Sequence, residues 1–118
     1  MSDFIEPKEL VAMQLVPDSS TAIYTGDATR KTKITQATIT EQAGAGTVTL
    51  QLWLVPDAGS TSNDNRLYNT QSISSNAVDF LDKLEGKILS AGTDIYAQAS
   101  AANELSIQIT GTVFEDPS

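Results

Sequence analysis

Apolar and polar residues alternate along much of this chain, and two segments show the alternation clearly. In residues 47–55 one face collects the large aliphatic side chains of Val48, Leu50, Leu52 and Leu54. In residues 105–113 one face collects Leu105, Ile107, Ile109 and Val113, with Gly111 in the remaining place. Successive side chains of a strand point to opposite sides of a sheet, so this pattern predicts two half-buried β-strands. Gly111 is expected to mark a bulge or a close neighbour.

Further segments rich in β-branched residues are separated by Gly, Pro, Asn and Asp. These segments are residues 9–16, 21–25, 31–41, 67–73, 76–81, 84–89 and 93–100. Residues 9–16 fit a short helix as well, and residues 76–84 fit a helical repeat about as well as alternation. Turn signals recur roughly every 8–12 residues, which is typical of an antiparallel β-sandwich or a small barrel. The pattern therefore predicts an all-β protein of about eight short strands.

The residue types that are missing exclude much chemistry. The 118 residues are enough for one domain and contain neither cysteine nor histidine. Zinc, haem and iron–sulfur sites lose their usual ligands, and thiol nucleophiles and histidine acid–base catalysis are excluded. Paired carboxylates remain, such as Asp79 with Asp82 and Asp57 with Asp64. Nothing in the pattern turns two of them inward, so we expect no enzyme, no cofactor and no metal.

The charge balance limits the partners. Fifteen acidic and seven basic residues give a net charge of -8. Such a chain repels phosphates and anionic lipid, so we expect neither nucleic acid nor membrane as a partner. No apolar run approaches the ~20 residues of a membrane helix, and the N-terminus shows no secretory signal pattern. The charge also favours solubility.

Two polar clusters are candidate sites. Arg30, Lys31 and Lys33 form a basic group, which either protects a strand edge or pairs with an acidic edge of an identical copy. The loop of residues 57–65 carries oxygen donors that could hold an ion or another ligand, namely Asp57, Asn63, Asp64 and Asn65. The simpler interpretation of this loop is an exposed, flexible connection, because the EF-hand pattern is not present.

Trp53 is the most informative single residue. By alternation it lies opposite the aliphatic face of its strand, beside Val55. An outward Trp is unfavourable unless something covers it, and three covers remain open. Trp53 and Val55 could form a protein–protein interface, or a loop of the same chain could cover Trp53. Alternatively Trp53 could be a sugar platform, together with Tyr68, Tyr96 and residues 63–65.

The order of several short motifs resembles a class of small tailed-bacteriophage virion proteins. The motifs are Tyr-Thr-Gly at 24–26, Leu-Trp-Leu-Val-Pro at 52–56, the Gly/Ser/Asn loop at 58–65, the turn and strand at 91–97, and the last strand at 107–114. The resemblance covers about residues 15–114 and lies in the order of the pieces. Thr93, between Gly92 and Asp94, and the longer N-terminal segment depart from the pattern.

The resemblance implies a non-enzymatic, jelly-roll-like antiparallel β-sandwich that is part of the virion. It implies a capsid decoration (cement) protein or a small tail component, made in the bacterial cytoplasm. Such a protein forms homo-oligomers and contacts the major capsid or tail proteins. The expected organisation is an arm or extra strand at 1–14, the sandwich at 15–114 and an acidic tail at 115–118. The alternative function is a carbohydrate- or receptor-binding sandwich of a phage tail.

Overall fold

The fold is built almost entirely of β-strands. The computed structural model describes residues 5–42, 44 and 46–115. Its elements are β1 (Ile5–Leu15), β2 (Thr21–Tyr24), β3 (Lys31–Glu41), β4 (Val48–Val55), the 3-10 helix η1 (Asn63–Asn65), β5 (Arg66–Ile73), β6 (Val78–Phe80), β7 (Ile88–Leu89), β8 (Asp94–Ala99) and β9 (Leu105–Phe114). Most predicted segments form strands close to their predicted boundaries, but β1 begins at Ile5 rather than at residue 9, and of residues 84–89 only Ile88–Leu89 is a strand.

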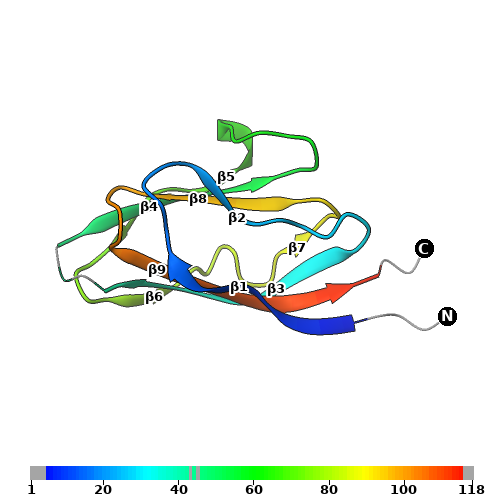
Figure 1. Cartoon of the computed structure of the whole chain (residues 1–118), viewed down its shortest axis with the longest axis horizontal. Coiled ribbons are helices and arrows are strands. Elements are labelled where there is room, and N and C mark those ends of the chain that lie inside the picture. Colours follow the sequence, from blue (N-terminus) through cyan, green and yellow to red (C-terminus); the bar gives the residue numbers. More distant parts are fainter. Residues whose placement is uncertain (1–4, 43, 45, 116–118) are drawn as a thin grey trace.

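The strands form two antiparallel sheets, stacked as two layers (Figure 1). The five-stranded sheet has the order β1-β9-β3-β6, with β7 also paired to β3, and the four-stranded sheet has the order β2-β8-β4-β5. Without the two-residue strand β7, eight strands remain. Counted in chain order, they are arranged 1-8-3-6 in one sheet and 2-7-4-5 in the other. This is the strand order of a jelly roll, a sandwich of two Greek keys. The predicted all-β, jelly-roll-like sandwich is confirmed, with nine strands in place of about eight.

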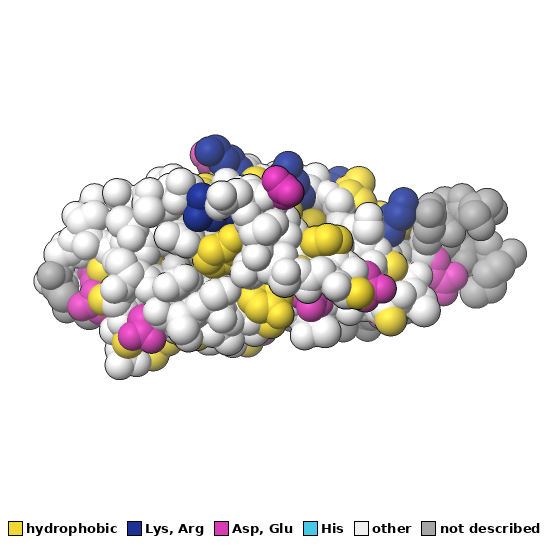
Figure 2. All heavy atoms as spheres, turned by 90° about the horizontal axis from the view of Figure 1, so that it is seen from above, with side chains coloured by type: hydrophobic (Ala, Val, Ile, Leu, Met, Phe, Trp, Pro, Cys, Tyr) yellow, Lys and Arg dark blue, Asp and Glu magenta, His cyan; other side chains and the backbone are white. Residues whose placement is uncertain are grey.

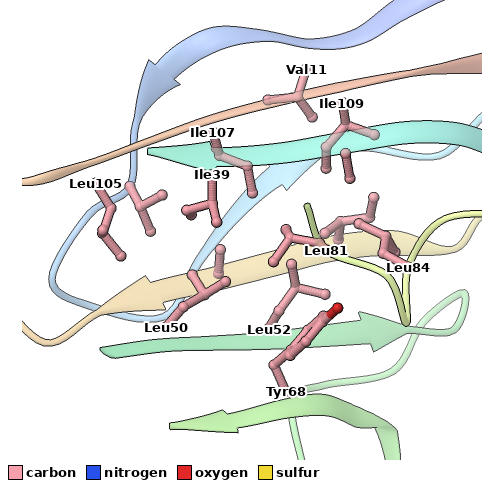
Figure 3. Close-up of a cluster of buried hydrophobic side chains, with 14 of the residues drawn as sticks. Val11, Ile39, Leu50, Leu52, Tyr68, Leu81, Leu84, Leu105, Ile107 and Ile109 are labelled. Atoms are coloured by element: carbon pink, nitrogen blue, oxygen red, sulfur yellow. The ribbon is translucent and has the colours of Figure 1, made fainter. Parts of the chain in front are cut away.

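The core lies between the inner faces of the two sheets. Its largest fully buried side chains include Leu50 and Leu52 from β4, Ile39 from β3, and Ile107 and Ile109 from β9 (Figure 3). Each such side chain contributes roughly 1.5–3 kcal/mol by leaving water. The alternation along β4 and β9 therefore places their aliphatic faces in the core, as predicted.

Residues 76–84, which fitted a helical repeat about as well as alternation, form a short strand followed by one turn. β6 covers only residues 78–80, and a single turn follows, in which the N–H groups of Leu84 and Glu85 both donate to the Leu81 carbonyl. The Leu81 N–H donates to the Ala37 carbonyl, so this turn runs along β3. Leu81 and Leu84 both enter the core (Figure 3). The helical repeat in the sequence reflects this one turn.

The N-terminal segment forms an edge strand. β1 pairs with β9 from Ile5↔Phe114 to Leu15↔Ser106. Of the two alternatives for residues 1–14, an arm or a strand, residues 5–14 adopt the strand. Residues 1–4 and most of the expected acidic tail, 116–118, lie outside the described residues.

Gly111 marks a close approach between strands, as the pattern predicted. A Cβ atom at this position would lie 2.2 Å from the Lys33 carbonyl oxygen and 2.9 Å from the Leu10 side chain. The neighbouring strand β3 shifts register between Ile34 and Gln36, opposite this part of β9. Glycine is therefore required here because any side chain would push β3 and β9 apart.

Candidate interaction surfaces

Trp53 lies on the outer face of the four-stranded sheet, yet it is buried. It pairs with Tyr96 of β8 in a regular register, one position from the inward pair Leu52↔Ala97. Only 7% of Trp53 and 2% of Val55 is exposed. Of the three covers considered, the structure favours cover by the same chain, which leaves Trp53 and Val55 little surface for a partner.

The connection between β4 and β5 lies on this side of the sheet (Figure 1). Its helix η1 contacts β4, and the connection lies above the outer face of the four-stranded sheet (Figure 1). Seen from this side, the hydrophobic side chains occupy separate small areas among polar ones (Figure 2). At the C-terminal end of β4, Val55 pairs with Asp94, whose carboxylate Oδ1 accepts a hydrogen bond from the Gly26 N–H at 3.0 Å. This outer face is therefore closed by the chain itself.

The oxygen-rich loop uses its donors and acceptors internally. The Asn65 side chain accepts a hydrogen bond from the Ser62 N–H at 3.0 Å and donates one to the Ser60 carbonyl at 2.8 Å. Asp57, Asn63 and Asp64 are exposed. Within the described ranges, no group of three or more acidic side chains is placed to hold a metal ion. The Asn65 side chain therefore helps to hold the loop, and η1 within the loop contacts β4.

The basic cluster is divided between a loop and a strand. Arg30 is held by Asp27, with Nη2 3.0 Å and Nε 3.2 Å from the Oδ2 atom. The Asp27 Oδ1 atom also accepts hydrogen bonds from the N–H groups of Thr29 and Arg30. These N–H groups and the guanidinium hold the pKa of Asp27 well below its usual range. Lys31 and Lys33 lie on β3, where Lys33 is exposed. The positive charge of Arg30 is therefore paired within its own loop, while Lys33 is exposed on the strand.

The aromatic residues proposed for sugar binding are not gathered on one face. Tyr68 pairs with Leu52 and belongs to the core, whereas Trp53 and Tyr96 lie on the opposite face of the same sheet. The Tyr68 hydroxyl accepts a hydrogen bond from the Lys83 N–H at 2.9 Å. Burial raises the pKa of this hydroxyl above its ordinary value. The structure therefore makes Tyr68 a structural residue that joins β5 to the turn after β6.

A hollow of about 410 Å³ lies between the edges of β5 and β6. Asp79 and Asp82 both line it, so the structure brings this predicted carboxylate pair together. Both come from the β6 side, and the β5 side contributes Tyr68, Gln71 and Ile73. Glycoside hydrolysis requires two carboxyl groups on opposite sides of the scissile bond, so this hollow does not have that arrangement. The other predicted pair, Asp57 and Asp64, is exposed.

The outer face of the five-stranded sheet differs, because large hydrophobic side chains are exposed along its edges. The exposed fractions are 55% for Met13, 41% for Leu15, 62% for Val78, 56% for Phe80 and 59% for Ile88. Met13 and Leu15 belong to β1, Val78 and Phe80 to β6, and Ile88 to β7. Among the described residues, every large hydrophobic side chain with this degree of exposure is on this sheet.

Four of these side chains end two rows that run across the sheet. The first row is Leu15, Ser106, Thr40 and Val78, paired strand by strand. In the second row Gln108 pairs with Thr38, which pairs with Phe80, and the bulge of β1 at residues 12–13 lies opposite Gln108. We call these two rows the uncharged patch: Met13, Leu15, Ser106, Gln108, Thr38, Thr40, Val78 and Phe80. Its edges are apolar and its centre is Ser, Thr and Gln, although Ser106 is only 7% exposed and donates a hydrogen bond to the Gln42 side chain at 2.9 Å.

Sequence reasoning did not single out the uncharged patch. Its signal was present, since Met13 and Leu15 are two residues apart and so are Val78 and Phe80. The strand register that aligns these pairs across β9 and β3 depends on contacts between residues far apart in the chain. Alternation alone also does not tell an inward apolar face from an outward one.

Comparisons with known proteins give little more. No protein-family model matches the chain, and no curated protein matches its sequence. Among solved structures, a chain in the structure of infectious bursal disease virus, Gx strain, aligns with a TM-score of 0.40 and 7% sequence identity. The alignment covers 100% of this chain and 38% of the viral chain, so this chain spans well under half of that chain's length. Similarity at this level establishes neither a family nor a shared activity. In the described residues no helix is long and apolar enough to cross a membrane.

Proposed function

We propose that this protein is a non-enzymatic structural subunit of a bacteriophage virion, specifically a capsid decoration (cement) protein. It acts by binding further copies of itself and neighbouring capsid or tail subunits. The observation that carries the proposal is the outer face of the five-stranded sheet, with five exposed large hydrophobic side chains along its edges. The order of the sequence motifs, which resembles small virion proteins of tailed bacteriophages, supplies the particle in which such a face would be covered.

Exposed apolar groups on a small acidic domain favour a binding role. Groups of such side chains, bordered by polar residues, are typical of surfaces that contact another macromolecule. A jelly roll is compatible with this role, since viral capsid domains use it, although the same fold also serves lectins. In a particle, each copy touches several neighbours, so modest individual contacts add up to stable attachment.

The residues available for catalysis support a non-enzymatic role. The sequence has no histidine and no cysteine. The carboxylates that meet in one hollow, Asp79 and Asp82, come from one wall of it. The tail-associated sugar-binding alternative is less well supported, because Trp53 is buried and Tyr68 faces the core. Binding of the chain to a glycan on a glycan array would support the sugar-binding alternative.

The proposal is tested by asking whether the chain is part of particles. Virions from a bacterial culture that carries the gene are banded in a density gradient, and quantitative mass spectrometry measures the chain in each fraction. We expect the chain to band with the particles in a fixed ratio to the major capsid protein. An abundant cytoplasmic host protein serves as the control that must be absent from the band. Particles that form while the chain stays in the soluble fractions would contradict the proposal.

A further inference from the structure

We infer that the uncharged patch binds the same patch of a second copy, in a face-to-face contact related by a two-fold axis. The inference rests on the proposed function, because it specifies the self-association through which the subunit would act. Its ligand is therefore another copy of this chain, recognised by shape and by the absence of charge.

The first argument is electrostatic. With a net charge of -8, two copies repel each other, and a contact between two identical surfaces is favoured where those surfaces carry no like charges. The eight residues of the uncharged patch include no Asp, Glu, Lys or Arg, although 19% of the chain is charged. Carboxylates border the patch on both sides, since Gln108 donates a hydrogen bond to Glu9 at 2.7 Å and Phe80 lines a hollow with Asp82 and Glu85. Few charged residues, together with Met and Phe, are typical of protein interfaces.

The second argument is symmetry. From β1 to β6 each row is apolar, polar, polar and apolar, so the pattern is the same from either edge. A two-fold axis in the plane of contact, along or across the strands, therefore places apolar edges on apolar edges and the Ser/Thr/Gln centre on itself. Contacts of this kind, in which one patch binds its own copy, are the commonest arrangement in homo-oligomers. A heterologous partner would not need this pattern.

The size of the patch sets the expected strength. Four strands spaced by about 4.8 Å and two rows separated by about 7 Å give a patch of roughly 300 Å². A stable dimer buries about 800 Å² on each partner. Pairing through the patch is therefore weak in solution, and it becomes effective when many copies are held on one particle.

The first experiment introduces charge at the centre of the patch. Thr38→Glu places two carboxylates near each other across the two-fold axis, and Thr38→Lys does the same with two ammonium groups. Sedimentation measured over a concentration series should show at least about tenfold weaker self-association for each variant alone, since facing like charges are strongly unfavourable. A mixture of the two variants should associate again, because opposite charges then face each other. Ser72→Glu, on the exposed edge strand β5, is the matched control and should associate like the wild type.

The second experiment uses the absence of cysteine. Because the chain has none, one introduced thiol is a unique attachment point. Thr40→Cys should give a covalent dimer with a short bis-maleimide cross-linker, whereas Ser72→Cys should remain monomeric. Thermal unfolding of each variant shows that it is folded before the association data are used.

The outcomes separate this inference from the proposed function. A wild-type chain that stays monomeric at every soluble concentration, with no cross-link at Thr40→Cys, overturns the face-to-face contact. So does a dimer that survives Thr38→Glu, or one that cross-links only through Ser72→Cys. In each of these cases the chain could still band with virions, and the proposed function would stand. A dimer that obeys the charge pattern, from a chain absent from particles, would support the contact and overturn the proposed function.

Discussion

The outer faces of the two sheets show how one alternating pattern leads to two different surfaces. On the four-stranded sheet, the connection after β4 folds back, its helix η1 contacts β4, and Trp53 is 7% exposed. On the five-stranded sheet, the long connection after β6 runs beside β3 and sends Leu81 and Leu84 into the core. The outer face of the five-stranded sheet is left with Val78 and Phe80 exposed. The path of the connection, rather than the pattern of the strand, decides which face is available to a partner.

Removing the buried indole should break the covered face. Trp53→Ala deletes a large side chain that is 93% covered, and such deletions cost about 3 kcal/mol or more of unfolding free energy. Urea unfolding followed by circular dichroism measures the change. Association of the variant that remains folded should equal that of the wild type, because Trp53 lies on the other sheet from the uncharged patch.

Trp53→Phe is the conservative control and should recover most of the stability. A Trp53→Ala protein with unchanged stability would mean that the indole is not covered in solution. Lost self-association in a stable Trp53→Ala protein would assign the interface to the covered face instead.

On the five-stranded sheet, order at the end of β3 depends on a buried carboxylate. Glu41 is fully buried, and its Oε1 atom accepts hydrogen bonds from the N–H groups of Gly44 and Asn76 at 2.9 and 3.0 Å. Glu41→Ala leaves these groups without that acceptor, which should lower the unfolding free energy by about 2 kcal/mol. Glu41→Gln keeps an oxygen acceptor and should cost less in the same unfolding measurement. If the two variants were equally unstable, the charge rather than the hydrogen bonds would be the stabilising feature.

The sequence was sufficient for most of the fold. Alternation along β4 and β9 depends only on which side chains a strand turns inward, and the structure confirms it at Leu52 and Ile109. The turn after β6 was visible as a helical repeat, since Leu81 and Leu84 are three residues apart. Local patterns of this kind are set by residues close together in the chain, so a single sequence reveals them.

The surfaces were harder to predict, because they depend on how distant segments meet. The pattern correctly placed Trp53 on the outer side of its strand, but the burial of Trp53 there depends on other segments of the chain, whose paths no local rule specifies. The patch around Thr38 and Phe80 depends on the register of four strands. Arg30 looked available for a partner, yet Asp27, three residues earlier, holds it.

Polar substitution on the uncovered face should have the opposite effect to Trp53→Ala. Phe80→Ser removes a side chain that is 56% exposed, so the unfolding free energy should change by less than about 1 kcal/mol. Self-association and the amount of chain in banded virions should both fall, because an apolar edge of the uncharged patch is lost. Ile88→Ser is the matched control on the same sheet, outside the two rows. A large loss of stability in Phe80→Ser would show that Phe80 belongs to the core of the monomer rather than to a contact.

The smallest effect is expected at the loop that carries Asp27, beside the covered face. The Thr29 N–H and then the Arg30 guanidinium lower the pKa of Asp27 below its ordinary value of 3.8. A carboxyl whose pKa is lower in the folded state stabilises the fold above its unfolded pKa, and this stabilisation is lost as the pH falls below about 4. In Asp27→Asn the thermal midpoint should therefore fall less steeply over this acid range than in the wild type.

Asp64→Asn removes one carboxylate from an exposed position and serves as the matched control. Equal acid slopes for Asp27→Asn and the wild type would mean that the Asp27–Arg30 contact does not hold the loop in solution. The closed end of the four-stranded sheet would then depend on the remaining contacts of this loop, such as the hydrogen bond from the Gly92 N–H to the Asp27 carbonyl.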